Sequence, residues 1–335
     1  MRYARSLPNN FKIAVYTEVS DEDLNGFVAS YDIGDVLSFK GIAEGVENSN
    51  YLLRTTGGNF ILTLYEKRVD ERDLPFFLGL MEFLSGEGIP CPLPVSDSMG
   101  NRLRTLAGRP AALITFLDGM WVRRPRNEHC AELGAGLAGL HLASTRFSME
   151  RQNALLMTAW REILDSCAGK LDRFESNLQH ELTADLEQIA SGWPSDLPRG
   201  VIHADLFPDN VFFLGGKLSG FIDFYFACTD FFAYDIAICL NAWCFETDGS
   251  FNITKAKALL RGYQSARTLS DAEIAALPIL ARGASMRFLV TRLFDWINTP
   301  EGAFVRPKDP VEYIKKLRFH RQIESAGEYG LEQVN

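Results

Sequence analysis

The sequence predicts an α+β protein with two lobes, a small lobe built on an antiparallel sheet and a larger, mostly helical lobe. Three observations lead to this prediction. The chain has 335 residues, more than one ordinary hydrophobic core accommodates. Its first third alternates short apolar runs with glycine-containing turns, which is typical of antiparallel strands. After Gly119 the apolar residues recur at helical spacing almost to the end of the chain.

The small lobe is expected to cover residues 14–118, and residues 1–13 are expected to form an N-terminal arm. Its first helix should begin after Ser20, because a serine hydroxyl can cap the helix and three acids then follow at its positive end. A second helix is expected from Asp73 to Leu84. The expected strands are residues 35–42, 49–55, 59–66, 102–106 and 110–117.

The larger lobe is expected to cover residues 119–335. Apolar residues at a period near 3.6 predict its helices, with no internal repeat and no low-complexity tract between them. These helices are expected at residues 127–145, 153–168, 174–191, 231–243, 253–267, 271–298 and 309–324.

Composition narrows the class of protein. A hydrophobic fraction of 47% with 23% charged residues is typical of a soluble globular chain. The net charge of −9 argues against a nucleic acid or an anionic membrane as partner. Six cysteines without a C-x-x-C pair favour buried thiols in a reducing compartment. With no apolar run of membrane-spanning length and no secretory signal, we expect a cytoplasmic protein, monomeric or homodimeric.

The strongest chemical signal lies between Gly200 and Asp223. His203, Asp205 and Asn210 have the spacing H-x-D-x-x-x-x-N, and Asp223 follows within I-D-F. Phosphoryl transfer from ATP requires an acceptor for the substrate hydroxyl proton and oxygen ligands for Mg²⁺. Asp205 suits the first task, and Asn210 with Asp223 suits the second. His203 is expected to stabilise the loop, and we do not expect it to bind metal.

The residues after this loop predict a hairpin. Val211–Leu214 has the composition of a strand, Gly215-Gly216 is typical of a tight turn, and residues 218–222 return as the partner strand. A structural hairpin with two solvated acids is the alternative, but it does not explain all these features in one order. Kinase catalytic loops carry H-R-D-x-x-x-x-N and then D-F-G. Here Ala204 stands at the Arg position, and the second motif reads D-F-Y from Asp223.

The chain resembles the aminoglycoside phosphotransferase-like kinases, relatives of the protein kinases, from about Ser38 to Phe319. Besides the catalytic motif, L-G-A-G-L-A-G-L-H at 133–141 is similar to the family's small-residue helix. A-A-L-I-T-F-L-D-G at 111–119 is similar to its interlobe hinge. The resemblance implies a protein-kinase-like fold, ATP and Mg²⁺ as cofactors, and backbone contacts to adenine from Thr115 and Phe116.

Within that superfamily the chain is most similar to the type II homoserine kinases. The shared sequence segments are G-I-A-E-G-V-E-N-S-N-Y at 41–51 and I-D-F-Y-F-A-C at 222–228. Related patterns occur at 234–245 and 287–296. The resemblance implies transfer of the ATP γ-phosphate to the side-chain hydroxyl of L-homoserine, a step of threonine biosynthesis. An alternative is a kinase of the same fold for choline, an aminoglycoside, methylthioribose or a fructosamine. A third reading is a catalytically inactive nucleotide-binding protein.

The nucleotide is expected to meet the turn at 41–50, where backbone N–H groups can approach its phosphates. The residues expected to take part are Gly41, Gly45, Ser49 and Asn50. An ordinary hairpin is the alternative.

The usual lysine–glutamate pair of kinases is absent from the small lobe. Thr63 stands where the phosphate-contacting Lys is expected, and Phe77 stands at the position of its Glu partner. Loss of both partners avoids one unpaired buried charge. Lys67 can supply the missing cation or lie in solvent.

The acceptor pocket must recognise the ammonium and the carboxylate of an amino acid. Arg287 and Arg292 lie on one expected helix, and a guanidinium can hold a carboxylate through two hydrogen bonds. Asp230 and Asp235 are candidates for the ammonium, and Tyr225 for the pocket wall. Ion pairs within the protein are the alternative for the charged residues.

Overall fold

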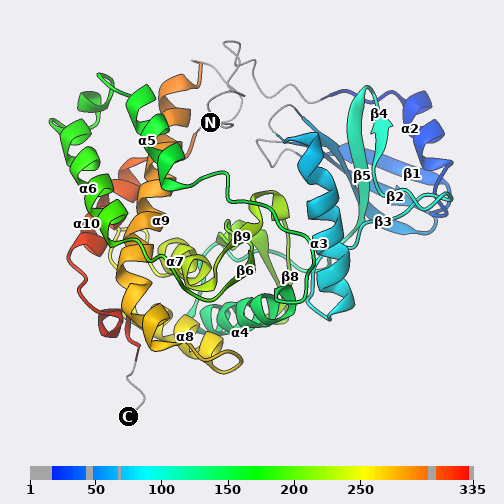
Figure 1. Ribbon diagram of the computed structural model, residues 1–335. Coiled ribbons are helices and arrows are strands. Elements are labelled where there is room, and N and C mark those ends of the chain that lie inside the picture. Colours follow the sequence, from blue (N-terminus) through cyan, green and yellow to red (C-terminus); the bar gives the residue numbers. More distant parts are fainter. Residues whose placement is uncertain (1–16, 43–47, 67–68, 301–306, 332–335) are drawn as a thin grey trace. The chain divides into compact units, whose positions relative to one another are not determined.

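The computed structural model describes residues 17–42, 48–66, 69–300 and 307–331, and these fall into two compact units. The first unit contains residues 17–119 and also 219–225, and the second contains 120–218 and 226–331. Figure 1 shows the first unit as a twisted sheet with two helices and the second as mainly helical. This arrangement of elements confirms the predicted fold class.

The sheet of the first unit has five antiparallel strands in the order β1-β2-β3-β5-β4. Its middle strand, β3, therefore pairs on both sides. Thr63 on β3 lies opposite Asn50 on one neighbour and Ala112 on the other. The elements of this unit are α2 (Asp21–Val28), β1 (Val36–Gly41), β2 (Asn48–Thr55), β3 (Gly58–Tyr65), α3 (Leu74–Gly86), β4 (Arg104–Leu106) and β5 (Arg109–Thr115).

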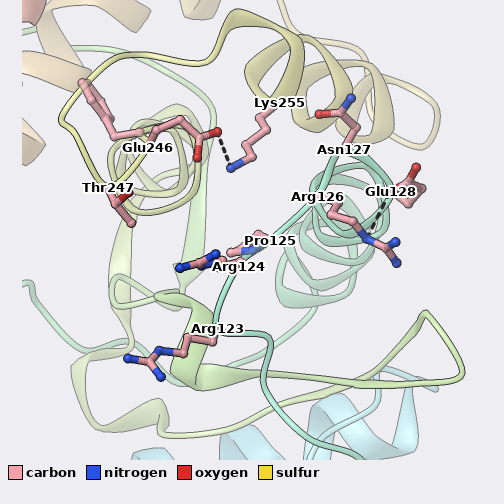
Figure 2. Close-up of a pocket in the computed structure, with 10 residues that line it drawn as sticks. Arg123, Arg124, Pro125, Arg126, Asn127, Glu128, Glu246, Thr247 and Lys255 are labelled. Carbon is pink, nitrogen blue, oxygen red and sulfur yellow. Dashed lines mark ion pairs between the residues drawn. The ribbon is translucent and has the colours of Figure 1, made fainter.

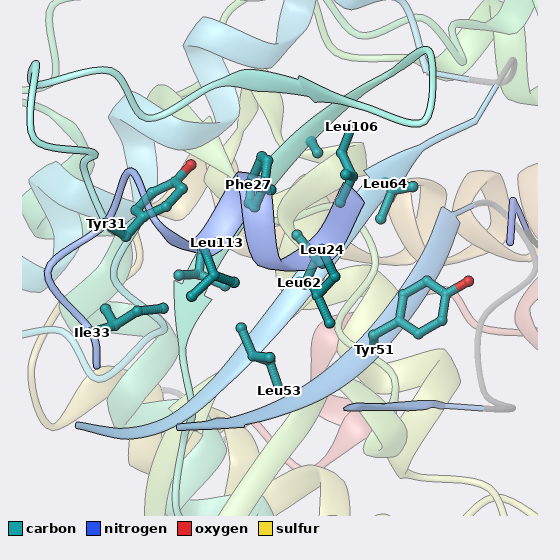
Figure 3. Close-up of a cluster of buried hydrophobic side chains, with 12 residues drawn as sticks. Leu24, Phe27, Tyr31, Ile33, Tyr51, Leu53, Leu62, Leu64, Leu106 and Leu113 are labelled. Carbon is teal, nitrogen blue, oxygen red and sulfur yellow. The ribbon is translucent and has the colours of Figure 1, made fainter. Parts of the chain in front are cut away.

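Helix α2 covers one face of this sheet. It begins after Ser20 as predicted, because the Ser20 hydroxyl accepts a hydrogen bond from the Asp23 backbone N–H at 3.1 Å. Its buried side chains join those of the strands in one core, shown in Figure 3. Burial of each such side chain stabilises the fold by about 1.5–3 kcal/mol. The core includes Leu24, Phe27, Val28, Tyr31, Ile33, Tyr51, Leu53, Leu62, Leu64, Leu106, Ala111 and Leu113.

The second unit combines seven described helices with short strands. β6 pairs antiparallel with β9, and β7 forms a hairpin with β8, whose residues from 219 on belong to the first unit. Gly215 and Gly216 have φ values of 60° and 83°, which confirms the predicted turn because glycine adopts positive φ without strain. The elements are α4 (Asn127–Ser144), α5 (Met157–Ser166), α6 (Leu178–Gly192), β6 (Arg199–Ile202), β7 (Val211–Leu214), β8 (Lys217–Phe221), β9 (Cys228–Phe231), α7 (Phe232–Trp243), α8 (Ile253–Gln264), α9 (Asp271–Asn298) and α10 (Val311–Arg321).

Two of these helices begin four residues later than the sequence predicts. α5 begins at Met157 because Asn153 forms a turn, in which its side chain accepts from the Leu155 N–H at 2.8 Å. α6 begins at Leu178 because Asn177 adopts a left-handed conformation, with φ of 67°. In both places a local asparagine conformation overrides the apolar periodicity.

Helix α9 corrects one expectation from composition. It is the one described helix that is long and apolar enough to cross a membrane, and no such segment was expected. However, 61% of its most apolar window is buried inside the protein, as in the core helix of a soluble fold. Length and composition alone are weak evidence for a membrane span.

Helices α4 and α8 lie side by side, and glycines allow their backbones to meet (Figure 1). A Cβ atom placed on Gly134 would lie 2.1 Å from the carbonyl oxygen of Leu259. A Cβ atom on Gly262 would lie 2.2 Å from the carbonyl oxygen of Ala131. Neither position accommodates a side chain, so the two glycines fix the separation of these helices.

Candidate active site

The predicted catalytic loop lies in the second unit, between the end of β6 and the start of β7. Asn210 is buried, and its Nδ2 donates to the Asp205 backbone oxygen at 2.8 Å and to Asp205 Oδ2 at 3.3 Å. The structure therefore brings together two of the residues that the motif singled out. The second bond holds the Asp205 carboxylate in a defined direction.

The same contacts leave Asn210 suited to bind a metal ion. Its amide nitrogen is turned toward Asp205, and no hydrogen bond to its Oδ1 is found among the described residues. Amide and carboxylate oxygens are ligands that Mg²⁺ accepts. The donor at Asn210 therefore fits the expected ion.

The environment of Asp205 favours a role as proton acceptor. Burial raises its pKa to about 6, the negative charge of Asp209 adds to this, and Arg287 and Lys308 oppose the increase. A carboxylate of this pKa is mainly ionised at neutral pH, yet more basic than an exposed aspartate. Asp205 can thus accept a proton at the pH of a cell.

Asp235 lies fully buried beneath this loop and holds its backbone. Its carboxylate accepts from the N–H groups of His203 and Ala204, at 2.8 and 2.9 Å, and contacts His141 Nε2 at 3.1 Å. The other ring nitrogen of His141 bonds to the hydroxyl of Tyr263 at 2.8 Å. Burial alone would raise the pKa of Asp235, but the His141 bond and the loop N–H hold it below its ordinary value.

The backbone of the loop is strained at one residue. Ala204 has a φ of 64°, a left-handed conformation that costs a residue with a Cβ atom about 1–2 kcal/mol. Its N–H is bonded to Asp235, and its carbonyl oxygen accepts from Arg287 Nη1. Asp223, in the first unit, has the same φ of 64°. Strained residues of this kind persist where surrounding contacts hold them, often at functional sites.

Three of the predicted substrate contacts have other partners in the structure. Arg287 is only 2% exposed and packs against the ring of Phe288, besides its bond to the loop. Arg292 is 8% exposed and pairs with Glu312 at 2.7 Å. The Asp235 carboxylate accepts hydrogen bonds from the backbone of the loop. Each of the three is engaged in contacts within the protein, and a role in binding the substrate stays a prediction.

Asp230 is better placed for a direct role but is also engaged. Its carboxylate accepts from Asn153 Nδ2 at 2.7 Å and from the Phe231 N–H at 2.8 Å. Burial raises its pKa above the ordinary value, and these two bonds oppose the increase. A role in binding the substrate ammonium stays a prediction.

In the first unit, the side chains of β2 and β3 bond to one another. Thr63 is buried and its hydroxyl donates to Asn50 Oδ1 at 2.8 Å. Ser49 is buried as well and donates to Glu66 at 2.8 Å. These bonds give Thr63 and Ser49 structural roles, and their contact with a nucleotide stays a prediction.

The predicted phosphate turn lies partly outside the described residues. Gly45 is not described, and neither is Lys67. Gly41 ends β1, and a Cβ atom there would meet only the Tyr51 ring, at ordinary distances of 3.7 and 3.8 Å. The fold therefore does not require glycine at position 41, and its role in approaching the phosphates stays a prediction.

The predicted hinge follows β5. The Thr115 N–H already donates to the Leu93 oxygen at 2.9 Å, and the Phe116 N–H donates to the Asn59 oxygen at 3.3 Å. Both donors are engaged within the first unit. A bond from either residue to adenine would therefore have to use a carbonyl oxygen as acceptor.

Tyr225 lies in an aromatic cluster that includes Phe77, the residue expected at the position of the kinase glutamate. The ring of Tyr225 meets the rings of Tyr65 and Phe77 edge-on, with centroids 5.5 and 5.6 Å apart. The two tyrosine hydroxyls are 3.3 Å apart. Burial raises the pKa of Tyr225 to about 12, and the negative charge of Asp223 acts in the same direction. The sequence analysis did not predict this cluster. The one signal for it was Tyr225, which stands in place of the glycine of D-F-G.

Comparison with known proteins shows the family to which the chain belongs. The family model described as the phosphotransferase enzyme family matches residues 38–269. A homoserine kinase of Brucella anthropi is 62% identical over 96% of this chain and 98% of its own length. A homoserine kinase of Xanthobacter autotrophicus is 61% identical over 95% and 99%. The chain belongs to this family, among its homoserine kinases.

Solved structures support the fold at lower identity. An amicoumacin kinase in complex with AMP-PNP, Ca²⁺ and Ami matches with a TM-score of 0.66 at 19% identity, over 91% of this chain and 93% of that one. A spectinomycin phosphotransferase with ADP and spectinomycin matches with a TM-score of 0.65 at 14% identity, over 93% and 97%. At these identities the likeness establishes the kinase-like fold alone.

Proposed function

We propose that this protein transfers the γ-phosphate of ATP to the side-chain hydroxyl of L-homoserine, a step of threonine biosynthesis. The observation that carries the proposal is the Asp205–Asn210 pair on a loop held by Asp235. The homoserine kinases with 62% and 61% identity support the acceptor. A kinase for choline, an aminoglycoside, methylthioribose or a fructosamine has no such support, and the intact pair argues against an inactive protein.

Asp205 carries the chemical step in this proposal. Its ionised carboxylate hydrogen-bonds the acceptor hydroxyl and takes its proton as the oxygen attacks the phosphorus. Asn210 holds the carboxylate in line through its Nδ2, and Asp235 holds the loop backbone. Because these contacts hold Asp205 in place, little reorganisation is needed at the moment of reaction.

We propose Asn210 and Asp223 as the protein ligands of Mg²⁺. When bound, the ion would offset the negative charge that develops on the phosphate oxygens. Asp223 is exposed and has a positive φ of 64°. The role of Asp223 rests on the motif, and that of Asn210 also rests on its oriented amide.

Arg287 and Arg292 are both engaged within the protein, so we consider a further cation for the carboxylate of the acceptor. Lys308 is a candidate because its side chain is 60% exposed and its charge acts on Asp205. Its Nζ lies 3.5 Å from Asp209 Oδ2, a long contact that a substrate carboxylate can replace. We propose that Lys308 binds the carboxylate of L-homoserine.

The proposal is tested by measuring ATP consumption with a panel of acceptors. The panel contains L-homoserine, serine, threonine, choline, methylthioribose and an aminoglycoside. Homoserine should exceed every other acceptor in kcat/KM by tenfold or more. A flat response would contradict the enzyme assignment, and a choline maximum would keep the kinase but reject the acceptor.

We also propose that the protein acts in the cytoplasm. All six cysteines are free and buried, and burial raises the pKa of each thiol above its ordinary value. Buried neutral thiols are compatible with a reducing compartment.

A further inference from the structure

The second unit contains a pocket of about 610 Å³ away from the residues proposed for catalysis. It lies where the segment leading into α4 meets the loop after α7 and the start of α8, as Figure 2 shows. Four cationic side chains and two carboxylates line it. Volumes of about 300–1,000 Å³ are typical of sites for small molecules.

Two of the four cations are neutralised within the pocket. Lys255 Nζ lies 2.6 Å from Glu246 Oε1, and its side chain is 10% exposed. Arg126 Nε lies 3.8 Å from Glu128 Oε2, with both side chains exposed. These pairs use both carboxylates of the pocket.

Arg123 and Arg124 are not neutralised. Both are exposed, and the described part of the chain offers neither a hydrogen bond nor an ion pair to their guanidinium groups. Figure 2 shows both extending toward the side of the pocket where Thr247 lies, while Arg126 turns the other way, toward Glu128. The pocket therefore keeps two adjacent positive charges in a chain whose net charge is −9.

We propose that this pocket binds a small phosphate monoester and thereby affects the catalytic loop. A phosphate monoester carries about −1.5 to −2 charges at neutral pH, which matches the two unpaired guanidinium groups. Guanidinium binds phosphate oxygens through paired, charge-assisted hydrogen bonds. A single carboxylate would leave one arginine uncompensated.

One continuous set of contacts leads from the arginines to the loop. Met120, at the start of their segment, forms a β-bridge with Phe213 on β7. The ring of Phe213 lies 6.2 Å from that of Trp243, whose Nε1 donates to the Leu206 carbonyl oxygen at 2.7 Å. Leu206 follows Asp205 in the chain. A ligand that orders the arginine segment therefore acts on a segment in contact with the loop.

The binding test uses the full-length protein and isothermal titration with glycerol 3-phosphate, inorganic phosphate, succinate and a hexaglutamate peptide. The variant is Arg123→Gln with Arg124→Gln. Its matched control is Arg161→Gln with Lys170→Gln, which removes the same charge from exposed positions outside the pocket. We expect the pocket variant to bind glycerol 3-phosphate at least tenfold more weakly than the wild type and the control.

Each other binding outcome overturns the proposal. Equal binding by pocket variant and control would place the ligand elsewhere, for example at the nucleotide site. Succinate that binds as tightly as glycerol 3-phosphate would replace the phosphate assignment with a general dianion site. A preference for hexaglutamate would make the pocket a docking site for an acidic peptide.

The effect on the loop has its own readout. Saturating glycerol 3-phosphate should change kcat of the wild type twofold or more, and leave kcat of the pocket variant unchanged. Equal changes in both proteins would mean action at the active site. Binding with no change in kcat would overturn the effect on the loop. Homoserine phosphorylation by the pocket variant without ligand tests the proposed function separately.

Discussion

The Asp235 carboxylate accepts a hydrogen bond from the His203 backbone N–H at 2.8 Å, across 32 residues of chain. Its second oxygen holds the next N–H, that of Ala204, at 2.9 Å. One buried residue thus fixes two consecutive peptide groups immediately before Asp205. The position of the proton acceptor depends on a side chain that does not itself need to meet the substrate.

The variant Asp235→Asn tests this positioning role. Asparagine has one acceptor oxygen, so its Nδ2 would face a backbone donor, which costs about 1–3 kcal/mol when buried. We expect kcat to fall tenfold or more, KM for ATP to stay within a few-fold, and urea unfolding to show lower stability. The same change at exposed Asp165 should have no effect. Wild-type kcat in folded Asp235→Asn would contradict the role.

Asp205→Asn should lower kcat by about 10²–10⁴-fold, the usual contribution of a positioned general base. ATP binding, measured by calorimetry, should persist because the proposed metal ligands remain. Asp165→Asn is the matched control, since Asp165 is an exposed acid of the same unit outside the loop. Turnover within a few-fold of wild type in Asp205→Asn would remove it from the chemical step.

Three variants of Asp223 separate its charge from its backbone conformation. Asp223→Gly relieves the positive φ of 64° but removes the carboxylate, and Asp223→Ala removes the carboxylate and keeps the strain. We expect both variants to lose Mg²⁺-dependent ATP binding. Asp223→Asn should still bind ATP with Mg²⁺, but weakly. If Asp223→Gly bound Mg-ATP normally in calorimetry, the residue would be structural.

Lys308→Met should raise KM for L-homoserine about tenfold, because the substrate carboxylate loses its cation. The kinetics of 3-aminopropan-1-ol, which lacks that carboxylate, should not change. Lys315→Met is the control, at an exposed lysine on α10. Equal losses with both acceptors would show that Lys308 acts on the loop instead, through Asp209.

The stability of the protein should fall between pH 7 and pH 5 because of His320. Burial lowers the pKa of His320 to about 3, and the nearby charge of Lys316 adds to this. The unfolded chain, with a histidine pKa near 6.5, therefore binds a proton in this range that the folded protein does not. The stability present above pH 6.5 is thus lost as the pH falls, by about 2 kcal/mol at pH 5.

This prediction is checked by urea unfolding of His320→Gln at both pH values. The variant should lose the part of the pH dependence that His320 contributes, whatever its absolute stability. His180→Gln, at an exposed histidine, should keep it. An unchanged pH difference in His320→Gln would assign the effect to other groups.

Sequence predicted the features that depend on nearby residues. The Ser20 cap, the Gly215-Gly216 turn and the extent of α9 follow from local patterns, and the structure has all three. The charged residues of the second unit were harder to place. The sequence shows the charges of Arg287 and Asp235, but it does not show which groups within the protein they contact. Their partners, Ala204 and His203, are distant in the chain.

The contacts that hold the catalytic loop run from Tyr263 through His141 to Asp235. They depend on the close packing of α4 and α8 at two glycines. Gly262 precedes Tyr263, which bonds to His141 on α4, and Gly134 lies two turns before that histidine. An engineer who seeks a more stable enzyme would favour alanine at both glycines, for a gain in helix propensity of about 1 kcal/mol each. Here either methyl group would meet a carbonyl oxygen of the other helix and separate α4 from α8. His141 would then shift relative to Asp235, so a change meant to strengthen two helices would loosen the catalytic loop.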